Sequence, residues 1–408
     1  MHIAVFLQYY HTPDCPTAAR PYALVERLAR DHEVTVITTR AWEDRRLADR
    51  YPWAPQGAQL MRLDVPYNNT MGPFARLQAF VDYAVRAVAH GLQMSRPDLI
   101  LGSSTPLTAA MAAATVAWAR DVPWIFEVRD LWPAFPIQMG ALDWPGLRSA
   151  LRGLEAALYR SAAHVVTLSP DMEQHVRTVV PSAPVRTLPY GTDLDAVDAI
   201  SDAQTAALRD RLALNGRFFV LYAGTFGRAN AIPTLLDAAD RLSGRSDLLV
   251  GLAGGGYHEP AVRRAARRHD HICLIDPLPY PDALALFSIA DLSLVSFADR
   301  PVLTANAPGK FFDSLSVGTP VIVTNPGWTK RFVHRHRCGW SVPPESPTAL
   351  ASRLRALLET PDALETAGQN ARRTARRQFD RADILHQYAR LVETIGREGV
   401  CSPSSAAP

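Results

Sequence analysis

The chain has 408 residues, of which 48% are hydrophobic and 20% are charged, with 23 Gly and 32 Pro. This length favours two or three domains, and the composition excludes a disordered, collagen-like or coiled-coil chain. The 43 basic and 40 acidic residues give a net charge of +3, which is too balanced to indicate nucleic acid as a partner. The longest uncharged stretch, residues 99–119, is interrupted by turn residues, so no membrane-spanning helix is predicted.

The N-terminus and the cysteines favour a cytoplasmic protein. The first ten residues, MHIAVFLQYY, lack the basic region and the small-residue cleavage site of a signal peptide. Cys15, Cys273, Cys338 and Cys401 are far apart and form no CxxC pair, so they indicate neither a zinc site nor a disulfide framework. Peripheral attachment to the inner face of the membrane is left open.

Strand and helix patterns alternate along the first half of the chain. Strands are predicted at residues 2–7, 32–39, 98–104, 122–130 and 164–169, and helices at residues 20–31, about 106–120 and 147–161. Short apolar strands without period-2 alternation are typical of a parallel sheet that is covered on both faces. The first domain is therefore predicted to be doubly wound.

A second series of strands and helices follows a weaker stretch at residues 193–214. Strands are predicted at residues 217–224, 247–256, 271–278, 291–297 and 319–325, with a helix at 232–242 between the first two. The chain therefore reads as an α/β protein of two Rossmann-like, doubly wound parallel-sheet domains. Residues 401–408 are predicted to be a flexible tail.

The first candidate site is a glycine turn after the strand at 217–224. In open parallel sheets, ligands sit beyond the carboxyl ends of the strands, and Gly224, Thr225, Gly227 and Arg228 lie at such an end. Glycines let backbone N–H groups approach a phosphate, and the following helix N-terminus adds about half a positive charge. A tight turn that needs glycine only for its backbone is the alternative.

The second candidate site is the start of a predicted helix whose first turn contains Pro308, followed by Gly309. Lys310 and Asp313 are three residues apart and share a helical face, which could hold a nucleotide diphosphate and its ribose. Only two of the 43 basic residues are lysines, Lys310 and Lys330, so a compact ammonium group stands out here. A solvated ion pair is the alternative.

A third group of polar residues lies at the carboxyl end of the strand predicted at 122–130. Glu127, Arg129 and Asp130 lie at the carboxyl end of this strand, just before Trp132-Pro133. They are candidates for a site at this strand end, although polar residues are also ordinary in loops.

Taken in order, these segments resemble the retaining nucleotide-sugar glycosyltransferases of the GT-B fold, family 4. Asp313 followed by SLSVGTPVIV resembles the second acidic residue of the family's C-terminal signature and its continuation. PYGTD at 189–193 resembles the junction between domains, HVVTLSPDM at 164–172 matches another family segment, and GLAGGG at 251–256 resembles a glycine-rich strand end.

One branch of this family is especially similar. FEVRDLWP at 126–133, together with PGKFFD at 308–313, resembles transferases that add amino- or deoxy-sugars in bacterial surface-polysaccharide assembly. The resemblance implies an acceptor-side domain at 1–195 and a donor-binding domain at 196–380, facing a cleft. It also implies that a helix at 381–400 crosses back to the N-terminal domain.

The resemblance places Lys310 at the donor diphosphate, Asp313 at the ribose, and Arg129 and Asp130 in the acceptor-side turn. The full set of predicted site residues comprises catalytic Asp130, Arg129 and Lys310; donor-binding Gly224, Thr225, Gly227, Arg228, Pro308, Gly309, Lys310 and Asp313; and acceptor-side Arg20 and Glu127.

The chain departs from the family pattern at several positions. Ala305 stands where the signature has its first acidic residue, and Thr225 and Asn230 replace a common Arg and Lys. Arg129-Asp130 stands in place of a His-Asp pair. These departures leave Arg228 and Lys310 as the cations near the expected diphosphate.

The expected function is transfer of a sugar from a nucleoside-diphosphate donor, with UDP favoured, to an acceptor hydroxyl with retained configuration. No cofactor and no metal are expected, because Asp193-Leu194-Asp195 imitates a metal-binding motif at a place that suits helix capping. The sugar would be a hexose or an N-acetylhexosamine. The acceptor is left open between a lipid-linked saccharide and a small natural product.

Two other functions and one surface are also left open. A nucleotide-sugar epimerase of the same fold would need acid and base groups at the cleft, and a two-domain sugar-binding protein would need no chemistry. The stretch 74–94 could lie on a lipid surface, although packing on the sheet is favoured.

Overall fold

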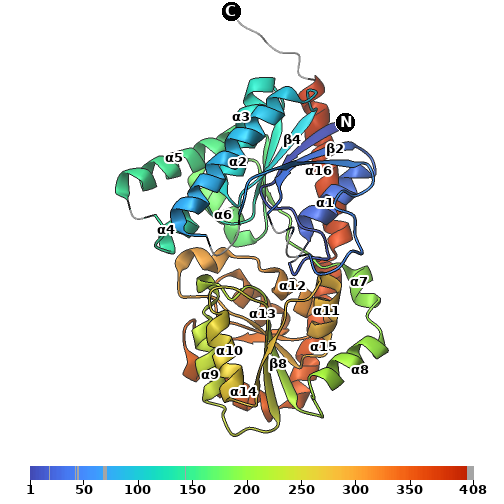
Figure 1. Cartoon of the computed structure of the whole chain (residues 1–408), viewed down its shortest axis with the longest axis vertical. Helices are drawn as coiled ribbons and strands as arrows, with labels where there is room; N and C mark the ends of the chain where they lie inside the picture. The colour runs from blue at the N-terminus through green and yellow to red at the C-terminus, as the bar shows by residue number, and fades with distance from the viewer. Residues whose placement is uncertain (18, 42, 44–45, 68–70, 143, 402–408) are drawn as a thin grey trace, which may run out of the picture. The chain divides into compact units, whose positions relative to one another are not determined.

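A computed structural model describes residues 1–17, 19–41, 43, 46–67, 71–142 and 144–401 of the chain. These residues form two compact units (Figure 1). Unit 1 comprises Met1–Thr12, Ala19–Pro189 and the chain from Asp383 onward, whereas unit 2 comprises Pro13–Ala18 and Tyr190–Ala382. The tail predicted for residues 401–408 lies outside the described residues, apart from Cys401.

Unit 1 is built on a seven-stranded sheet with the order β3-β2-β1-β4-β5-β6-β7, in which every neighbouring pair is parallel. The strands are β1 (His2–Phe6), β2 (Glu33–Thr39), β3 (Ala58–Leu63), β4 (Leu99–Ser103), β5 (Trp124–Val128), β6 (His164–Thr167) and β7 (Val185–Thr187). The helices are α1 (Arg20–Ala29), α2 (Pro73–Gln93), α3 (Leu107–Arg120), α4 (Ala134–Gln138), α5 (Pro145–Ser161), α6 (Pro170–Val179) and α16 (Arg381–Cys401).

Helices cover both faces of this sheet, because successive residues of a strand point to opposite sides. Val5 of β1 packs in a cluster with Val25 of α1 and Tyr388 of α16. On the other face, the ring of Phe6 lies against α2 at Gly91, where Val116 of α3 also approaches. The apolar run of β1 is therefore buried on both sides, as expected for a central parallel strand.

Helix α16 carries the chain from unit 2 into unit 1. It begins with Arg381 and Ala382, which belong to unit 2. From Asp383 onward it belongs to unit 1, where Tyr388 and Val392 are fully buried in the core.

Unit 2 is built on a six-stranded parallel sheet with the order β10-β9-β8-β11-β12-β13. The strands are β8 (Phe218–Ala223), β9 (Leu248–Ala253), β10 (Ile272–Ile275), β11 (Leu292–Val295), β12 (Val321–Val323) and β13 (Gly339–Ser341). The helices are α7 (Leu194–Asp198), α8 (Asp202–Arg211), α9 (Ile232–Asp240), α10 (Glu259–Arg268), α11 (Tyr280–Ser288), α12 (Gly309–Val317), α13 (Trp328–His336), α14 (Pro347–Leu358) and α15 (Pro361–Gln378). Two short 3-10 helices are η2 (Arg228–Asn230) and η3 (Pro301–Ala305).

This sheet is also covered on both faces. Val220 and Tyr222 of β8 pack in a core cluster with residues of α9, α10 and α14. The alternate residues Phe219 and Leu221 pack in a second cluster with residues of α8 and α11. The prediction of two doubly wound α/β domains with parallel sheets is therefore confirmed.

The sequence patterns missed the strands at the two edges of the first sheet. Strand β3 has only one buried residue, Leu63, and β7 is three residues long, so neither shows a buried apolar run. Asp193 accepts a hydrogen bond from the backbone N–H of Ala196 at 3.0 Å, which confirms that it caps a helix.

Both sheets have the same place for a ligand. The strand order reverses direction between β1 and β4 in unit 1 and between β8 and β11 in unit 2. Crevices outside the carboxyl ends of the strands at such reversal points are where ligands bind in this class of sheet. The loops after β1, β4, β8 and β11 are therefore the first places to look for a site.

Candidate active site

The turn after β8 is closely fitted against the turn after β9. A Cβ atom on Gly254 would lie 2.1 Å from the carbonyl oxygen of Gly224, so only glycine allows this approach. The N–H of Gly224 donates to Ala253 at 2.8 Å, and the N–H of Phe226 donates to Gly255 at 2.8 Å. The close approach of the two turns explains the glycine at position 254, directly after β9.

Side chains also hold the glycine turn in place. The hydroxyl of Tyr222 and the side-chain amide of Asn230 each donate to the carbonyl oxygen of Thr225 at 2.9 Å. Phe226 is fully buried beneath the turn. Gly224 and Gly227 remain partly accessible and Thr225 is exposed, so the turn is fixed yet open to a ligand.

Lys310 lies directly beside this turn. It is in the first turn of α12, which begins at Gly309 after the N-cap residue Pro308, one position later than predicted. Its Nζ atom lies 3.8 Å from the centre of the Tyr222 ring and 2.9 Å from the position that a Cβ atom on Gly224 would occupy. Burial lowers the pKa of the Lys310 ammonium group to about 7. The glycine turn and the lysine therefore form one site in unit 2.

Arg228 occupies another side of the turn. Its guanidinium group lies 4.3 Å from the centre of the Tyr257 ring, in the loop that follows β9. Arg228 is exposed, so its charge is available to a ligand. Lys310 and Arg228 thus flank the glycine turn through contacts with two different tyrosine rings.

Asp313 has different neighbours from Lys310, although both belong to α12. Its Oδ1 atom accepts hydrogen bonds at 3.0 Å from the hydroxyls of both Thr192 and Tyr280. Arg381 in turn donates to the Tyr280 hydroxyl at 2.6 Å. Burial raises the pKa of Asp313 to about 6, while the Arg381 charge and the two hydrogen bonds oppose this rise. The Oδ2 atom has no hydrogen-bond donor among the residues that the structure describes.

In unit 1, Arg129 and Asp130 follow β5 in a turn that Ser104 organises. The Ser104 hydroxyl accepts a hydrogen bond from the N–H of Arg129 at 2.9 Å and donates to the carbonyl oxygen of Asp130 at 3.2 Å. Thr105 donates to Oδ2 of Asp130 at 3.1 Å. Burial raises the pKa of the Asp130 carboxyl, against the opposing charge of Arg129.

Arg20 and Glu127 are deeper in unit 1 than predicted. They form an ion pair at 3.2 Å, and they are only 1% and 5% exposed. Arg20 also donates to the carbonyl oxygens of Leu188 and Pro189. The buried pair joins α1 to β5 and to the end of the segment after β7, and contact of either residue with an acceptor stays a prediction.

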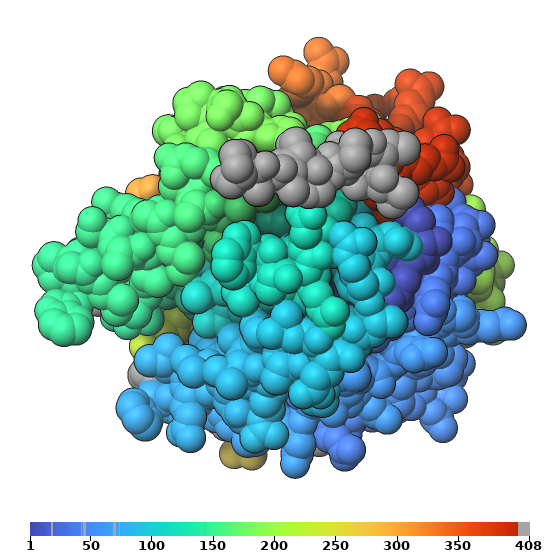
Figure 2. Space-filling view, turned by 90° about the horizontal axis from the view of Figure 1, so that it is seen from above, coloured from blue at the N-terminus to red at the C-terminus, as the bar shows by residue number. Residues whose placement is uncertain are grey.

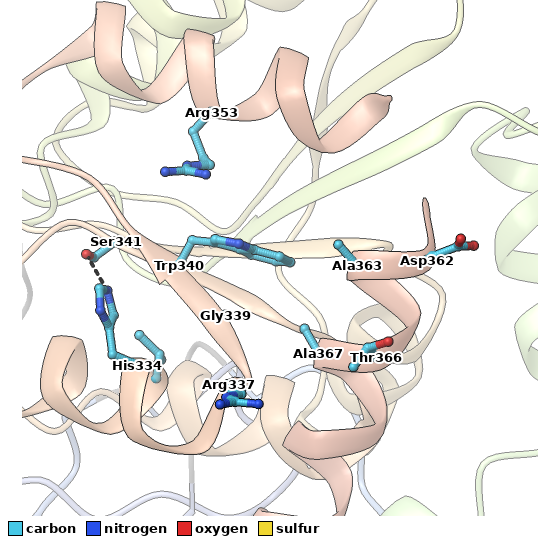
Figure 3. A pocket seen from close by; sticks show the side chains of 11 residues that line it. His334, Arg337, Gly339, Trp340, Ser341, Arg353, Asp362, Ala363, Thr366 and Ala367 are labelled. Carbon is cyan, nitrogen blue, oxygen red and sulfur yellow. Dashed lines mark hydrogen bonds between the residues drawn. The ribbon is translucent and has the colours of Figure 1, made fainter. Parts of the chain in front are cut away.

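A cavity lies elsewhere in unit 2, at the edge strand β13. It has a volume of about 570 Å³ and is lined by Arg337, Trp340, Arg353 and neighbouring residues (Figure 3). Strands β11 and β12 lie between β8 and β13 in the sheet. No predicted site residue lines this cavity. Among the described residues, no group of three or more His, Cys, Asp or Glu side chains is placed to hold a metal ion.

Comparison with known proteins decides the family. A Glycosyl transferase 4-like domain model matches residues 17–191, and a Glycosyl transferases group 1 model matches residues 204–374. The two models follow one another along most of the chain.

The chain is a family 4 glycosyltransferase of the GT-B fold.

Curated relatives of this glycosyltransferase act in different settings. The colanic acid biosynthesis glycosyl transferase WcaI of Escherichia coli (strain K12) is 26% identical over 387 residues, which cover 90% of this chain and 93% of the relative. The alpha-D-kanosaminyltransferase of Streptomyces kanamyceticus is 22% identical over 243 residues, or 58% and 62% of the two chains.

Solved structures share the fold. Anabaena Alr3699/HepE in complex with UDP-glucose has a TM-score of 0.71 at 16% identity, covering 97% of this chain and 100% of that one. The sucrose-phosphate synthase of Thermosynechococcus elongatus has a TM-score of 0.71 at 20% identity, with 97% and 99% covered. At these identities the likeness concerns the fold alone.

Two residues of this glycosyltransferase that the sequence analysis did not single out lie in the loop after β1. Gln8 is fully buried, and its side-chain amide has no hydrogen-bond partner among the described residues. His11 is half-buried; desolvation and the nearby charge of Arg129 lower its pKa to about 3, so its imidazole is neutral. The position of β1 at the reversal of strand order is the signal that could have found them.

Proposed function

We propose that this glycosyltransferase transfers a sugar, with retained configuration and without a metal, from a nucleoside-diphosphate sugar to an acceptor hydroxyl. The observation that carries the proposal is the contact of Lys310 with the glycine turn at Gly224. A partly accessible ammonium group beside backbone N–H groups and a helix N-terminus is suited to a diphosphate.

The proposed catalysis follows from where charge develops. Breaking the glycosidic bond leaves negative charge on the departing diphosphate, which preorganised cations and amide groups stabilise. Lys310, Arg228 and the first-turn amides of α12 supply these groups from the chain itself. Because the diphosphate is neutralised by these residues, we propose that no divalent ion is needed.

Asp313 is the residue that we propose binds the ribose of the donor. Its Oδ1 atom is held by Thr192 and Tyr280, whereas Oδ2 is left to accept hydrogen bonds from the ribose hydroxyls. UDP is the favoured nucleotide, since the solved structures of Anabaena Alr3699/HepE contain UDP, UDP-glucose, or UDP and glucose. An acceptor that is a growing surface saccharide or a small natural product is supported by the names of the two curated relatives.

The acceptor side of the proposal rests on Asp130 and Arg129. In a reaction on the donor's front face, the departing phosphate oxygen takes the acceptor proton, so a dedicated base is not required. Asp130, held by Thr105, then positions the acceptor or stabilises developing positive charge. Glu127 is paired with Arg20, which occupies one of the two carboxylates, Glu127 and Asp130, that an epimerase would use.

The first test is a thermal-shift screen of the full chain against UDP, GDP, ADP and dTDP. A nucleotide at about 100 times its Kd should stabilise the folded chain by about 2.7 kcal/mol. With the nucleotide known, its glucose and N-acetylglucosamine derivatives are incubated with and without octyl glycoside acceptors. Release of nucleoside diphosphate that depends on the acceptor and survives a chelator is expected, with retention seen by NMR. Sugar conversion without an acceptor would contradict the proposal.

A further inference from the structure

Helix α2 presents large apolar side chains to solvent along its whole length. Phe74, Leu77, Val81, Val85 and Leu92 are spaced by three, four, four and seven residues, so they lie on one helical face; we call them the α2 stripe. Phe74 is 81% exposed and Val85 is 64% exposed. Over 18 residues the α2 stripe is about 27 Å long, at about 1.5 Å per residue.

The opposite face of α2 is already used for packing on unit 1. Ala79, Tyr83, Ala87 and Gly91 are buried, and the Tyr83 hydroxyl donates to Ile37 of β2 at 2.9 Å. A helix on the surface of a domain normally shows polar residues on its outer face. Because both faces of α2 are apolar, the α2 stripe has no role in the fold of the described chain and indicates an interaction surface.

Neighbouring helices of unit 1 also carry exposed tryptophans. Helices α2, α3 and α5 lie side by side on this side of unit 1 (Figures 1 and 2). Arg120 at the end of α3 donates to the carbonyl oxygens of Leu92 and Met94, which brings the ends of α2 and α3 together. Trp118, one turn from that end, is 85% exposed, and Trp144 before α5 is 76% exposed. Tryptophan is the residue that favours the boundary between lipid and water.

The charge on these helices indicates a negatively charged partner. Helices α2, α3 and α5 together contain six arginines and two acidic residues, Asp82 and Glu155. Glu155 is buried, where it accepts hydrogen bonds from Tyr159 and His175. The three helices therefore hold an excess of four positive charges, which exceeds the net charge of +3 of the whole chain.

We propose that the α2 stripe docks this protein onto an anionic lipid bilayer. An apolar face with surrounding arginines lies in the headgroup region, where lipid tails cover the apolar side chains and anionic headgroups meet the cations. No helix in the described part of the chain is long and apolar enough to cross the bilayer. The proposal concerns unit 1 alone and does not depend on the donor or on the transfer reaction.

The experiment measures co-sedimentation of the full chain with vesicles of phosphatidylcholine, with and without phosphatidylglycerol. Binding to the phosphatidylglycerol vesicles is expected to fall as salt is added. The triple variant Phe74→Gln, Val81→Gln, Val85→Gln should bind at least about tenfold more weakly. Val81→Gln alone should weaken binding a few-fold, whereas Leu47→Gln should not; these two side chains are 50% and 48% exposed.

A matched pair of charge reversals tests the electrostatic part. Arg86 pairs with Asp82 and Arg263 pairs with Glu259, each four residues earlier, and the two arginine side chains are 50% and 51% exposed. Arg86→Glu should weaken vesicle binding at least about fivefold, and Arg263→Glu should change it less than about twofold. Thermal melting checks that each variant is folded.

Three outcomes would overturn the proposal. One is wild-type protein that does not bind phosphatidylglycerol vesicles. Another is equal weakening by Arg86→Glu and Arg263→Glu, since binding would then follow the charge of the whole chain. The third is a wild-type dimer in analytical ultracentrifugation that the triple variant converts to a monomer, because a second copy of the chain would then cover the α2 stripe.

Discussion

The two units share a strand order but use the ends of their strands differently. In unit 2, Lys310 lies beside a glycine turn that is open to a ligand, and its ammonium group has no anionic partner among the described residues. In unit 1, Arg20 lies against Glu127 and both are buried. The basic residue near the strand ends is therefore half-buried in one unit and buried in an ion pair in the other. The lack of an anionic partner among the described residues therefore distinguishes Lys310 from Arg20.

The largest expected effect comes from breaking the buried pair of unit 1. Glu127→Ala leaves the Arg20 guanidinium buried without its carboxylate, which typically costs about 3–5 kcal/mol. We expect the urea midpoint of the full chain to fall accordingly, while the Kd for UDP, measured where the chain is folded, stays within about twofold. Glu127→Gln should recover part of the stability, because an amide oxygen can still accept from Arg20. A variant of normal stability that loses only acceptor turnover would instead place Glu127 among the acceptor contacts.

Removing the half-buried cation of unit 2 should leave the fold intact and impair the reaction. Lys310→Ala is expected to lower kcat/KM for the donor at least about tenfold, or about 1.4 kcal/mol, because a contact to the leaving diphosphate is lost. Lys330→Ala is the matched control, since Lys330 is the other lysine of the chain and is exposed on α13. Equal kinetics for the two variants would remove Lys310 from the site.

The fit of the glycine turn around Lys310 can be tested separately. A Cβ atom on Gly224, where φ is +138°, would meet the Lys310 Nζ atom at 2.9 Å. Gly224→Ala should therefore displace the lysine and weaken UDP binding about five- to tenfold. Gly216→Ala provides the control: φ is +80° there, so the backbone is also strained, but nothing lies within 4 Å of the added atom. If both variants bind UDP equally well, the position of Lys310 does not depend on the missing Cβ atom at Gly224.

The smallest expected effect is a pH dependence. Burial lowers the pKa of Lys310 to about 7, so its charged, diphosphate-binding form is lost as the pH rises above 7. The Kd for UDP should rise about fivefold between pH 7 and pH 8. The free energy of unfolding of the unliganded protein should increase over the same pH range, because the unfolded chain binds this proton more tightly between pH 7 and 10.5. Lys310→Arg should flatten the binding profile, and an unchanged slope in that variant would show that another group titrates.

Sequence patterns predicted the fold and the short motifs well, and they failed where contacts join distant segments. The alternation of apolar strands and helices gave both doubly wound sheets, and the glycine turn and Lys310 were found as short local motifs. The partners of Asp313 are Thr192 and Tyr280, which lie 121 and 33 residues away, so no local pattern contains them. The burial of Arg20 against Glu127, 107 residues away, was hidden for the same reason.

The central claim is that unit 2 holds a diphosphate between the glycine turn and Lys310. Titration calorimetry of UDP and UMP against the wild type and Lys310→Ala tests it directly, because the two nucleotides differ by one phosphate. The account predicts that wild type prefers UDP at least about tenfold over UMP and that Lys310→Ala loses most of this preference. A preference that is the same in both proteins would contradict it.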